Sequence, residues 1–209
     1  MRLPVQRVPI SLPGASRRLL AMAVSATLSL AAGHAAELPQ PCTAGACGAN
    51  GPAAWVTSGS ATGTVTGNRF RIEQQSQGAT LNWRSFNIGP EGTVEFQQPN
   101  ATAVALNRIF QQDPSRILGA LDANGQVYLI NTNGIVFGEG ARVNVGGMVA
   151  STLDITPQAL ANGIAQAINS SPAAPSFRGS VDATGKPVNG VARIEQGAVI
   201  EADGGQVMV

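Results

Sequence analysis

The chain has 209 residues, 44% of them hydrophobic, so it can build a core and does not have the composition of a disordered protein. Its formal net charge is +1, but four arginines fall within the first 18 residues and no acidic residue precedes Glu37. The rest of the chain is slightly acidic and has no cluster of Lys or Arg, which argues against binding to nucleic acid or to an anionic membrane.

The N-terminal segment has the pattern of a secretory signal. Arginines precede an apolar run of about 14 residues, which is too short to span a bilayer comfortably. Gly33 and Ala35 are small residues of the kind that signal peptidase selects, so residues 1–35 are predicted to be a signal peptide, cleaved after Ala35. Cleavage after Ala36 is an alternative that places His34 where a small residue is favoured. A short buried helix is the alternative interpretation of the whole segment.

Two cysteines, Cys42 and Cys47, follow the predicted cleavage site. An oxidising compartment permits a disulfide, and the small residues between the two cysteines allow the loop to close, so pairing is favoured over free thiols. Two thiols alone do not supply the four ligands of a zinc site, so no metal is expected. Residues 36–60 are rich in Ala, Gly, Pro and Ser and are predicted to form a leader or cap segment around Trp55.

Residues 61–209 have the sequence pattern of a strand-rich domain. From about Gly63 onward, short apolar or alternating runs recur between Gly, Asn and Asp turn formers. The predicted strands are Arg69–Gln74, Ala79–Trp83, Thr93–Gln97, Ala103–Asn107, Arg116–Leu121, Gln126–Asn131, Ile135–Phe137, Arg142–Val145, Met148–Thr152, Val191–Glu195, Ala198–Glu201 and Gln206–Val209.

Two architectures compete for this pattern: antiparallel hairpins in a sandwich or barrel, and a solenoid of stacked parallel strands. Short strands and small corner residues favour the solenoid. Asparagines at corner-like positions, where amides can bond along a stack, favour it as well: Asn107, Asn131, Asn133 and Asn144. One helix is predicted over residues 156–168, where Thr156 is a suitable N-cap and Pro157 suits the first turn. Residues 154–180 are interpreted as an excursion from the β-stack.

The sequence offers little catalytic chemistry. The single histidine, His34, lies in or beside the signal peptide, which leaves the mature chain without the commonest general base. No phosphate-binding or Gly-Xaa-Ser-Xaa-Gly motif is present, and no cofactor is expected. Carboxylate pairs for glycoside hydrolysis are available, but surface or turn roles are favoured for them: Glu91 with Glu95, and Glu195 with Glu201 and Asp203. Aromatic residues that could stack on sugars are favoured as core residues: Trp83, Phe86, Phe96, Phe110 and Tyr128.

An ordered series of segments resembles the haemagglutination-activity domain, the N-terminal secretion domain of filamentous-haemagglutinin-like exoproteins of Gram-negative bacteria. The resemblance covers residues 60–155 well and 180–209 more loosely. The segments that carry it are Asn68–Phe70, Leu81–Gly89, Thr93–Phe96, Ala103–Ile109, Ser115–Leu121, Gly125–Gly138 and Val143–Ile155.

This resemblance implies an all-β, right-handed parallel β-helix with extra-helical strands and an N-terminal cap. It also implies two-partner secretion: the general secretory translocon delivers the chain to the periplasm, POTRA domains of an outer-membrane β-barrel transporter recognise it, and it folds outside. The chain is then secreted or displayed at the cell surface, as the start of a longer, adhesin-like solenoid. The host or cell-surface receptor and the effector class, whether adhesin, haemolysin, haem-acquisition protein or contact-dependent toxin, are not specified by these residues.

The family motif Asn-Pro-Asn-Gly-Ile corresponds here to Asn131-Thr132-Asn133-Gly134-Ile135, with Thr132 in place of proline. A structural turn is favoured over direct contact with the transporter, because Asn and Gly at a corner have a backbone reason to be there. A second family motif, Asn-Pro-Asn-Leu, has only a remote counterpart at Gln98-Pro99-Asn100-Ala101. Two other functions remain as alternatives: a β-helical polysaccharide-active enzyme and a stand-alone surface-binding module.

Overall fold

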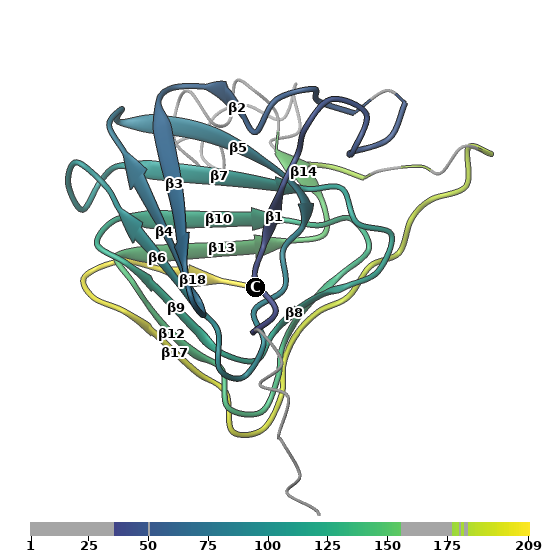
Figure 1. Ribbon diagram of the computed structural model, residues 1–209. Helices are drawn as coiled ribbons and strands as arrows, with labels where there is room; N and C mark the ends of the chain where they lie inside the picture. Colours follow the sequence, from purple (N-terminus) through teal and green to yellow (C-terminus); the bar gives the residue numbers. More distant parts are fainter. Residues whose placement is uncertain (1–35, 50, 156–176, 180, 182–183) are drawn as a thin grey trace, which may run out of the picture. The chain divides into compact units, whose positions relative to one another are not determined.

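The computed structural model describes residues 36–49, 51–155, 177–179, 181 and 184–209, and all the regular secondary structure among them is β (Figure 1). The predicted signal peptide, with its cleavage site at Ala35, lies outside the described residues. So does the predicted helix over residues 156–168. Within the described part of the chain, no helix has the length and hydropathy to cross a membrane.

The strands follow one another closely along the chain. In order they are β1 (Gln40–Pro41), β2 (Val56–Ser58), β3 (Ala61–Thr66), β4 (Arg69–Gln74), β5 (Gly78–Ser85), β6 (Thr93–Gln97), β7 (Val104–Ile109), β8 (Ser115–Ile117), β9 (Ala120–Ala123), β10 (Gln126–Ile130), β11 (Ile135–Phe137), β12 (Arg142–Val145), β13 (Gly147–Ser151), β14 (Asp154–Ile155), β15 (Phe177–Arg178), β16 (Ala192–Ile194), β17 (Val199–Ala202) and β18 (Val207–Met208).

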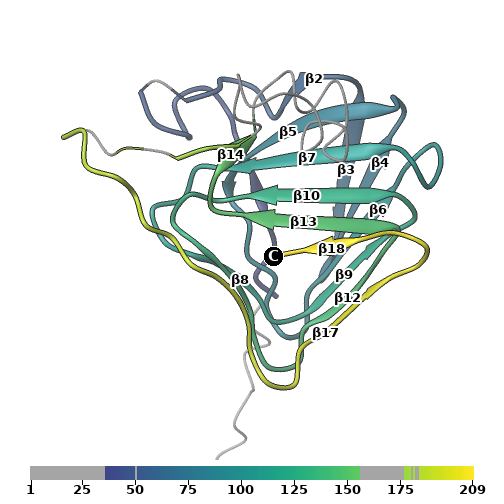
Figure 2. The same ribbon diagram turned by 180° about the vertical axis from the view of Figure 1, so that it is seen from behind.

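The strands stack into three parallel sheets that wind round one core (Figures 1 and 2). Sheet B contains β4, β6, β9, β12 and β17, sheet A contains β5, β7, β10, β13 and β18, and sheet C contains β8, β11 and β16. Successive rungs of the solenoid are β6–β7–β8, β9–β10–β11 and β12–β13–β16. The first rung consists of β4, β5 and Ile88, which forms a parallel bridge to Ile117. The predicted fold class, a parallel β-helix with extra-helical strands and an N-terminal cap, is confirmed.

Alternating apolar residues explain the stacking. In sheet B, the register places Phe70, Val94, Leu121, Val143 and Ile200 in line, one above another, across five rungs. The first four are buried, and their polar neighbours in the sequence point outward. Because side chains alternate across a strand, a slip of one residue would expose the whole line, so the apolar pattern fixes the register.

Sheet A is buried on both faces, unlike sheet B. Its inner face joins the main core, whereas its outer face carries a second apolar cluster that includes Leu106, Tyr128 and Val149 in register across β7, β10 and β13. Ile155 of β14 belongs to this cluster, and Arg108 of β7 contacts Asp154 at 3.2 Å. The β14–β15 pair is antiparallel and lies outside the three parallel sheets.

The N-terminal end of the solenoid is capped by antiparallel strands. β1 and β2 pair one after the other with the same edge of β5, whereas β3 pairs with β4 in sheet B. A chain of aromatic rings joins this cap to the first rung, with Trp83 in contact with Trp55, Phe70 and Phe86 at centroid distances of 5.2–5.5 Å. The cap therefore closes one end of the main core.

One strand prediction was wrong, and one six-residue strand was missed. The predicted strand Arg116–Leu121 is two strands on different sheets, β8 and β9, separated by a corner at Leu118-Gly119. Ala61–Thr66 was not predicted, yet it forms β3. Its Thr- and Gly-rich sequence lacks the apolar side chains by which the other strands were recognised.

The corner at Gly119 requires glycine because three backbones meet there. A Cβ on Gly119 would lie 2.3 Å from the carbonyl oxygens of both Gly89 and Gly92. We expect Gly119→Ala to lower the free energy of unfolding by about 2–3 kcal/mol, as other overpacked sites do. Urea titration followed by circular dichroism measures the change.

Gly78→Ala is the matched control for that substitution. Gly78 lies in β5, and a Cβ there would have no heavy atom within 4 Å. The control should be neutral or slightly stabilising, since alanine restricts the unfolded chain. Equal stability of the two variants would contradict the steric explanation of the Gly119 corner.

Candidate recognition surfaces

The motif Asn131-Thr132-Asn133-Gly134 forms a tight turn between β10 and β11. The Gly134 N–H donates to the Asn131 carbonyl oxygen at 3.0 Å, and the Asn133 N–H donates to the Asn131 side-chain oxygen at 2.9 Å. Gly134 has a φ of 125°, a value that other residues rarely adopt. The geometry accounts for Asn at the first position and Gly at the fourth.

Asn131 is fully buried, and its amide also ties this turn to the preceding rung. Its Nδ2 donates to the carbonyl oxygen of Asp113 at 3.2 Å and to Ser115 Oγ at 3.0 Å. The half-buried Asn133 donates from its Nδ2 to the carbonyl oxygen of Gln111 at 2.7 Å. Both side chains therefore bond neighbouring corners, which gives each a structural role.

A groove of about 630 Å³ runs beside this turn on the outer side of sheet C. Arg116 and Arg193 lie along it in register, with Val136 between them. Asn87 and Asn133 come from corners of different rungs and also line the groove. Arg193 is ion-paired with Glu195 at 2.7 Å, and the amide nitrogens of Asn87 and Asn133 already donate to Glu37 and to the Gln111 carbonyl oxygen.

A second groove, of about 850 Å³, lies on the outer side of sheet B. The register places Glu95 beside Asp122, and Asn144 beside Asp122 on the next rung. Arg69 donates to Glu95 at 2.7 Å and thereby lowers the pKa of that carboxyl. Burial and the neighbouring Glu95 raise the pKa of Asp122. Sequence reasoning missed Asp122, because only the register shows that it lies beside another carboxylate.

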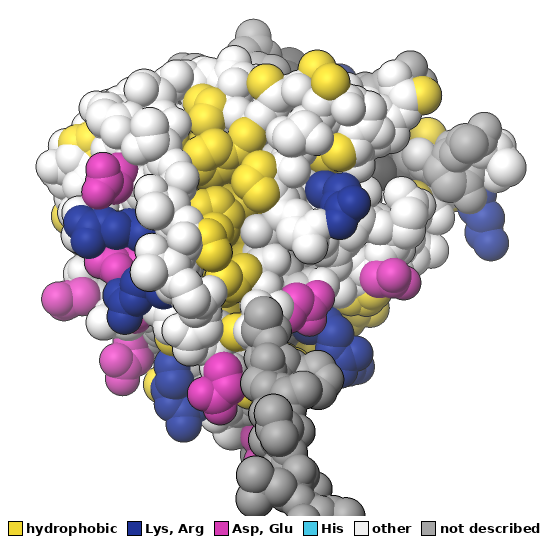
Figure 3. Space-filling view, in the orientation of Figure 1, with side chains coloured by type: hydrophobic (Ala, Val, Ile, Leu, Met, Phe, Trp, Pro, Cys, Tyr) yellow, Lys and Arg dark blue, Asp and Glu magenta, His cyan; other side chains and the backbone are white. Residues whose placement is uncertain are grey.

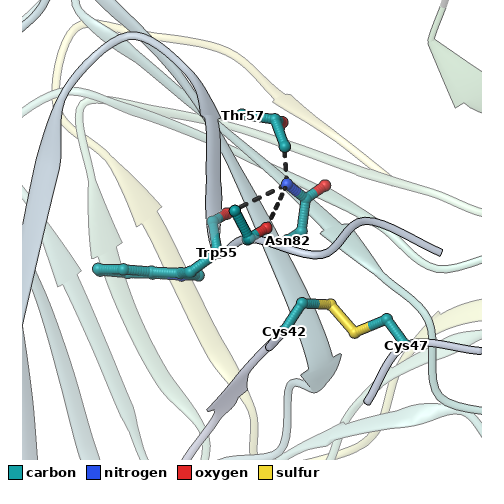
Figure 4. The surroundings of a disulfide bond; sticks show 6 residues. Cys42, Cys47, Trp55, Thr57 and Asn82 are labelled. Carbon is teal, nitrogen blue, oxygen red and sulfur yellow. Dashed lines mark hydrogen bonds between the residues drawn. A yellow bond between two sulfur atoms is a disulfide. The ribbon is translucent and has the colours of Figure 1, made fainter. Parts of the chain in front are cut away.

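The cap is organised around Asn82, a buried residue of β5 (Figure 4). Its backbone N–H donates to the Trp55 carbonyl oxygen at 2.7 Å, and its carbonyl oxygen accepts from Cys42 N at 2.9 Å. Its Nδ2 donates to the Trp55 carbonyl oxygen and to Thr57 Oγ1. Asn82 therefore holds the ends of both β1 and β2 at one point.

In the structure, Cys42 and Cys47 form a disulfide beside this junction, with Cα atoms 5.6 Å apart (Figure 4). The bond closes a short loop at the point where β1 ends. It restrains the segment between two cap strands that contribute only two and three residues each.

The carboxylates that were weighed for catalysis have other partners or positions. Glu95 pairs with Arg69, and Glu195 pairs with Arg193 at 2.7 Å. Glu91 is exposed within a turn, and Glu201 and Asp203 are exposed. Across the described ranges, no three His, Cys, Asp or Glu side chains gather in a way that could hold a metal ion. Of the aromatic residues, Trp83, Phe86 and Phe96 are fully buried, Tyr128 is 8% exposed and Phe110 is 36% exposed.

Two of the four asparagines expected at corners lie elsewhere. Asn107 is buried in the middle of β7 and accepts a hydrogen bond from Trp83 Nε1 at 2.9 Å, and Asn144 is exposed within β12. Amide stacking occurs instead at the corner between sheets B and A. There Gln98 Nε2 donates to Gln74 Oε1 at 3.3 Å, and Gln98 exchanges backbone hydrogen bonds with the Asn124 side chain.

Comparison with known proteins gives consistent results. The family model of the TPS secretion domain matches residues 53–207. A heme/hemopexin-binding protein of Haemophilus influenzae strain Rd is 43% identical over 100 residues, which are 48% of this chain and 11% of that protein. A second Haemophilus influenzae protein of that name is 45% identical over 91 residues, 44% of this chain and 10% of that protein.

The chain is also similar to solved structures. The HMW1 secretion domain from Haemophilus influenzae is 41% identical, with a TM-score of 0.49 over 51% of this chain and 28% of that chain. The chain spans about a tenth of the length of the curated relatives that it matches.

Proposed function

Because the chain belongs to the TPS secretion domain family, we propose that it is the secretion domain of an exported protein and is recognised by the POTRA domains of a partner outer-membrane transporter. The family match over residues 53–207 is the observation that carries this proposal, since it spans the cap strand β2 and all five rungs. In this proposal residues 1–35 are the signal peptide, residues 36–60 the cap segment, and residues 61–209 the β-helical domain of a secreted or surface protein of a Gram-negative bacterium.

Folding of the solenoid can drive transport across the outer membrane without nucleotide hydrolysis. Each rung buries its apolar residues only when it stacks on the one before, as repeat proteins do. A chain that emerges N-terminus first can therefore add rungs outside while the rest is still being threaded. Burial of apolar surface in each new rung opposes backsliding.

The last rung supports the proposal that this domain begins a longer solenoid. β17 and β18 of this rung, and β16 at the edge of sheet C, each pair with one neighbour among the described strands, and apolar residues on these three strands are exposed, including Ile194, Val199 and Val207. An open edge of this kind favours further strand pairing. A further rung would cover both the edges and the apolar side chains.

A non-enzymatic role fits the site chemistry better than a polysaccharide-active enzyme. Of the two neighbouring carboxylates in the sheet B groove, Asp122 has the raised pKa that a general acid needs, but Glu95 is held in an ion pair with Arg69 and is not free to act as the second carboxylate of a hydrolase. Relatives share only the secretion domain with this chain. Whether the exported protein is adhesin-like or related to the heme/hemopexin-binding proteins therefore depends on residues outside that domain.

Secretion in a reconstituted host tests the proposal. The full chain, expressed with its partner transporter, should appear in the medium, and without the transporter it should remain in the periplasm. The control is an unrelated protein fused to the C-terminal end of residues 1–35, which should reach only the periplasm whether or not the transporter is present. Equal amounts of the chain in the medium with and without the transporter would overturn two-partner secretion. If the purified chain hydrolysed glycans and the Glu95→Gln variant did not, the result would support a polysaccharide-active enzyme instead.

A further inference from the structure

β3 is an open sheet edge at the N-terminal end of the solenoid. It pairs with β4 on one side, and among the described residues no strand pair or backbone hydrogen bond engages its other side. The N-terminal edge of sheet A, in contrast, is covered by β1 and β2. Sheet B therefore offers a row of unpaired N–H and C=O groups.

The sequence of β3 lacks the features that protect edge strands. Natural edges carry Lys, Pro, bulges or inward-pointing charges, which prevent pairing with another chain. Residues 61–66 read Ala-Thr-Gly-Thr-Val-Thr, with no charge and no proline, and they pair with β4 without a bulge. All of them except Ala61 are exposed, and Val65 is 56% exposed.

An apolar band adjoins this edge. Figure 3 shows hydrophobic side chains gathered between β3 and β1. Half-buried apolar side chains of the cap pack on the core here, and they include Trp55, whose ring would meet a Cβ placed on Gly63. A strand added beside β3 would extend sheet B beside this capped end of the core.

The strand is complementary to itself. If two copies pair antiparallel about Thr64, then Thr62 faces Thr66 of the second copy, so the outer face carries threonines only. On the inner face, Val65 faces Gly63 of the second copy in both halves of the pair. The large exposed side chain thus meets the residue without one, and cross-strand Thr–Thr pairs are favourable in sheets.

We propose that β3 pairs with β3 of a second copy of this chain, antiparallel about a two-fold axis at Thr64. Such an interface is isologous, the commonest kind in homodimers. It joins the N-terminal ends of two solenoids and leaves the last rung of each free for further rungs. The proposal is independent of transporter recognition, since it concerns the folded domain.

Cysteine cross-linking tests both the pairing and its register. In the full chain purified from the periplasm of an expressing host, Thr64→Cys brings two Cα atoms to about 4.5–5.5 Å across the axis, within reach of a disulfide. Thr62→Cys is the matched control, because two copies of residue 62 would lie about 14 Å apart. On a non-reducing gel, the covalent dimer should be at least about five-fold more abundant for Thr64→Cys.

Charge changes at the axis supply a second measurement. Thr64→Lys and Thr64→Glu should each be monomeric by light scattering, and a mixture of the two should recover the dimer. Equal cross-linking at positions 62 and 64, or a wild-type chain that stays monomeric at about 100 μM, would overturn the proposal. Loss of binding to the transporter's POTRA domains in Thr64→Lys, with a monomeric wild type, would assign the edge to that partner instead.

Discussion

Trp83→Ala is expected to lower the free energy of unfolding by about 3–5 kcal/mol, the range for a fully buried aromatic side chain. Trp83 is 0% exposed and touches the rings of Trp55, Phe70 and Phe86. The substitution removes the centre of the aromatic chain that joins the cap to the first rung. Because later rungs stack on the first, the loss should reduce the stability of the whole domain, as measured by urea titration.

Two variants separate packing from hydrogen bonding at this site. Trp83→Phe keeps a ring but leaves Asn107 Oδ1 without its donor, so a loss of about 1–3 kcal/mol is expected. Phe110→Ala removes an aromatic side chain that is 36% exposed and should change stability by less than about 1 kcal/mol. A loss below about 1 kcal/mol for Trp83→Ala would show that the cap and the first rung are not coupled.

Strand positions were largely predictable from the sequence because each core-facing strand alternates or clusters apolar residues between turn formers. Arg69–Gln74, Thr93–Gln97 and Arg142–Val145 were predicted with the bounds that the structure gives. The corner at Leu118-Gly119 was not predictable by this rule, since the apolar run continues through it. A corner inside an apolar run requires knowledge of which backbones cross there, and that information is tertiary.

Cross-rung relations were the part that sequence reasoning could not supply. Asp122 lies beside Glu95 only through the register of β6 and β9, and Asn107 is satisfied by Trp83 from 24 positions earlier. The sequence has no strict repeat, so the lengths of the corners determine which residues lie side by side on neighbouring rungs. These lengths differ from rung to rung. The same irregularity explains why amides stack at Gln74 and Gln98 rather than at the asparagines expected to do so.

Asn131→Ala is expected to lower the free energy of unfolding by about 2–4 kcal/mol. Secretion should fall as well, because the folded domain is less stable. The substitution leaves buried Ser115 Oγ, the Asp113 carbonyl and the Asn133 N–H without the partner that each has now. Unsatisfied buried groups cost about 1–3 kcal/mol each. If the motif is structural, binding of the unfolded chain to the POTRA domains should be unchanged while the secreted, protease-resistant fraction falls.

Thr132→Pro restores the proline of the family motif and serves as the control. Proline is favoured at the second position of such a turn, so stability should be unchanged or should rise by about 0.4–1 kcal/mol, with secretion maintained. A different result would reassign the turn: if Asn131→Ala abolished POTRA binding by the unfolded chain, then its amide would be a direct contact. The burial of Asn131 and its hydrogen bonds to the neighbouring corner favour the structural role, because a side chain with 0% exposure is accessible to a partner only before the rungs have formed.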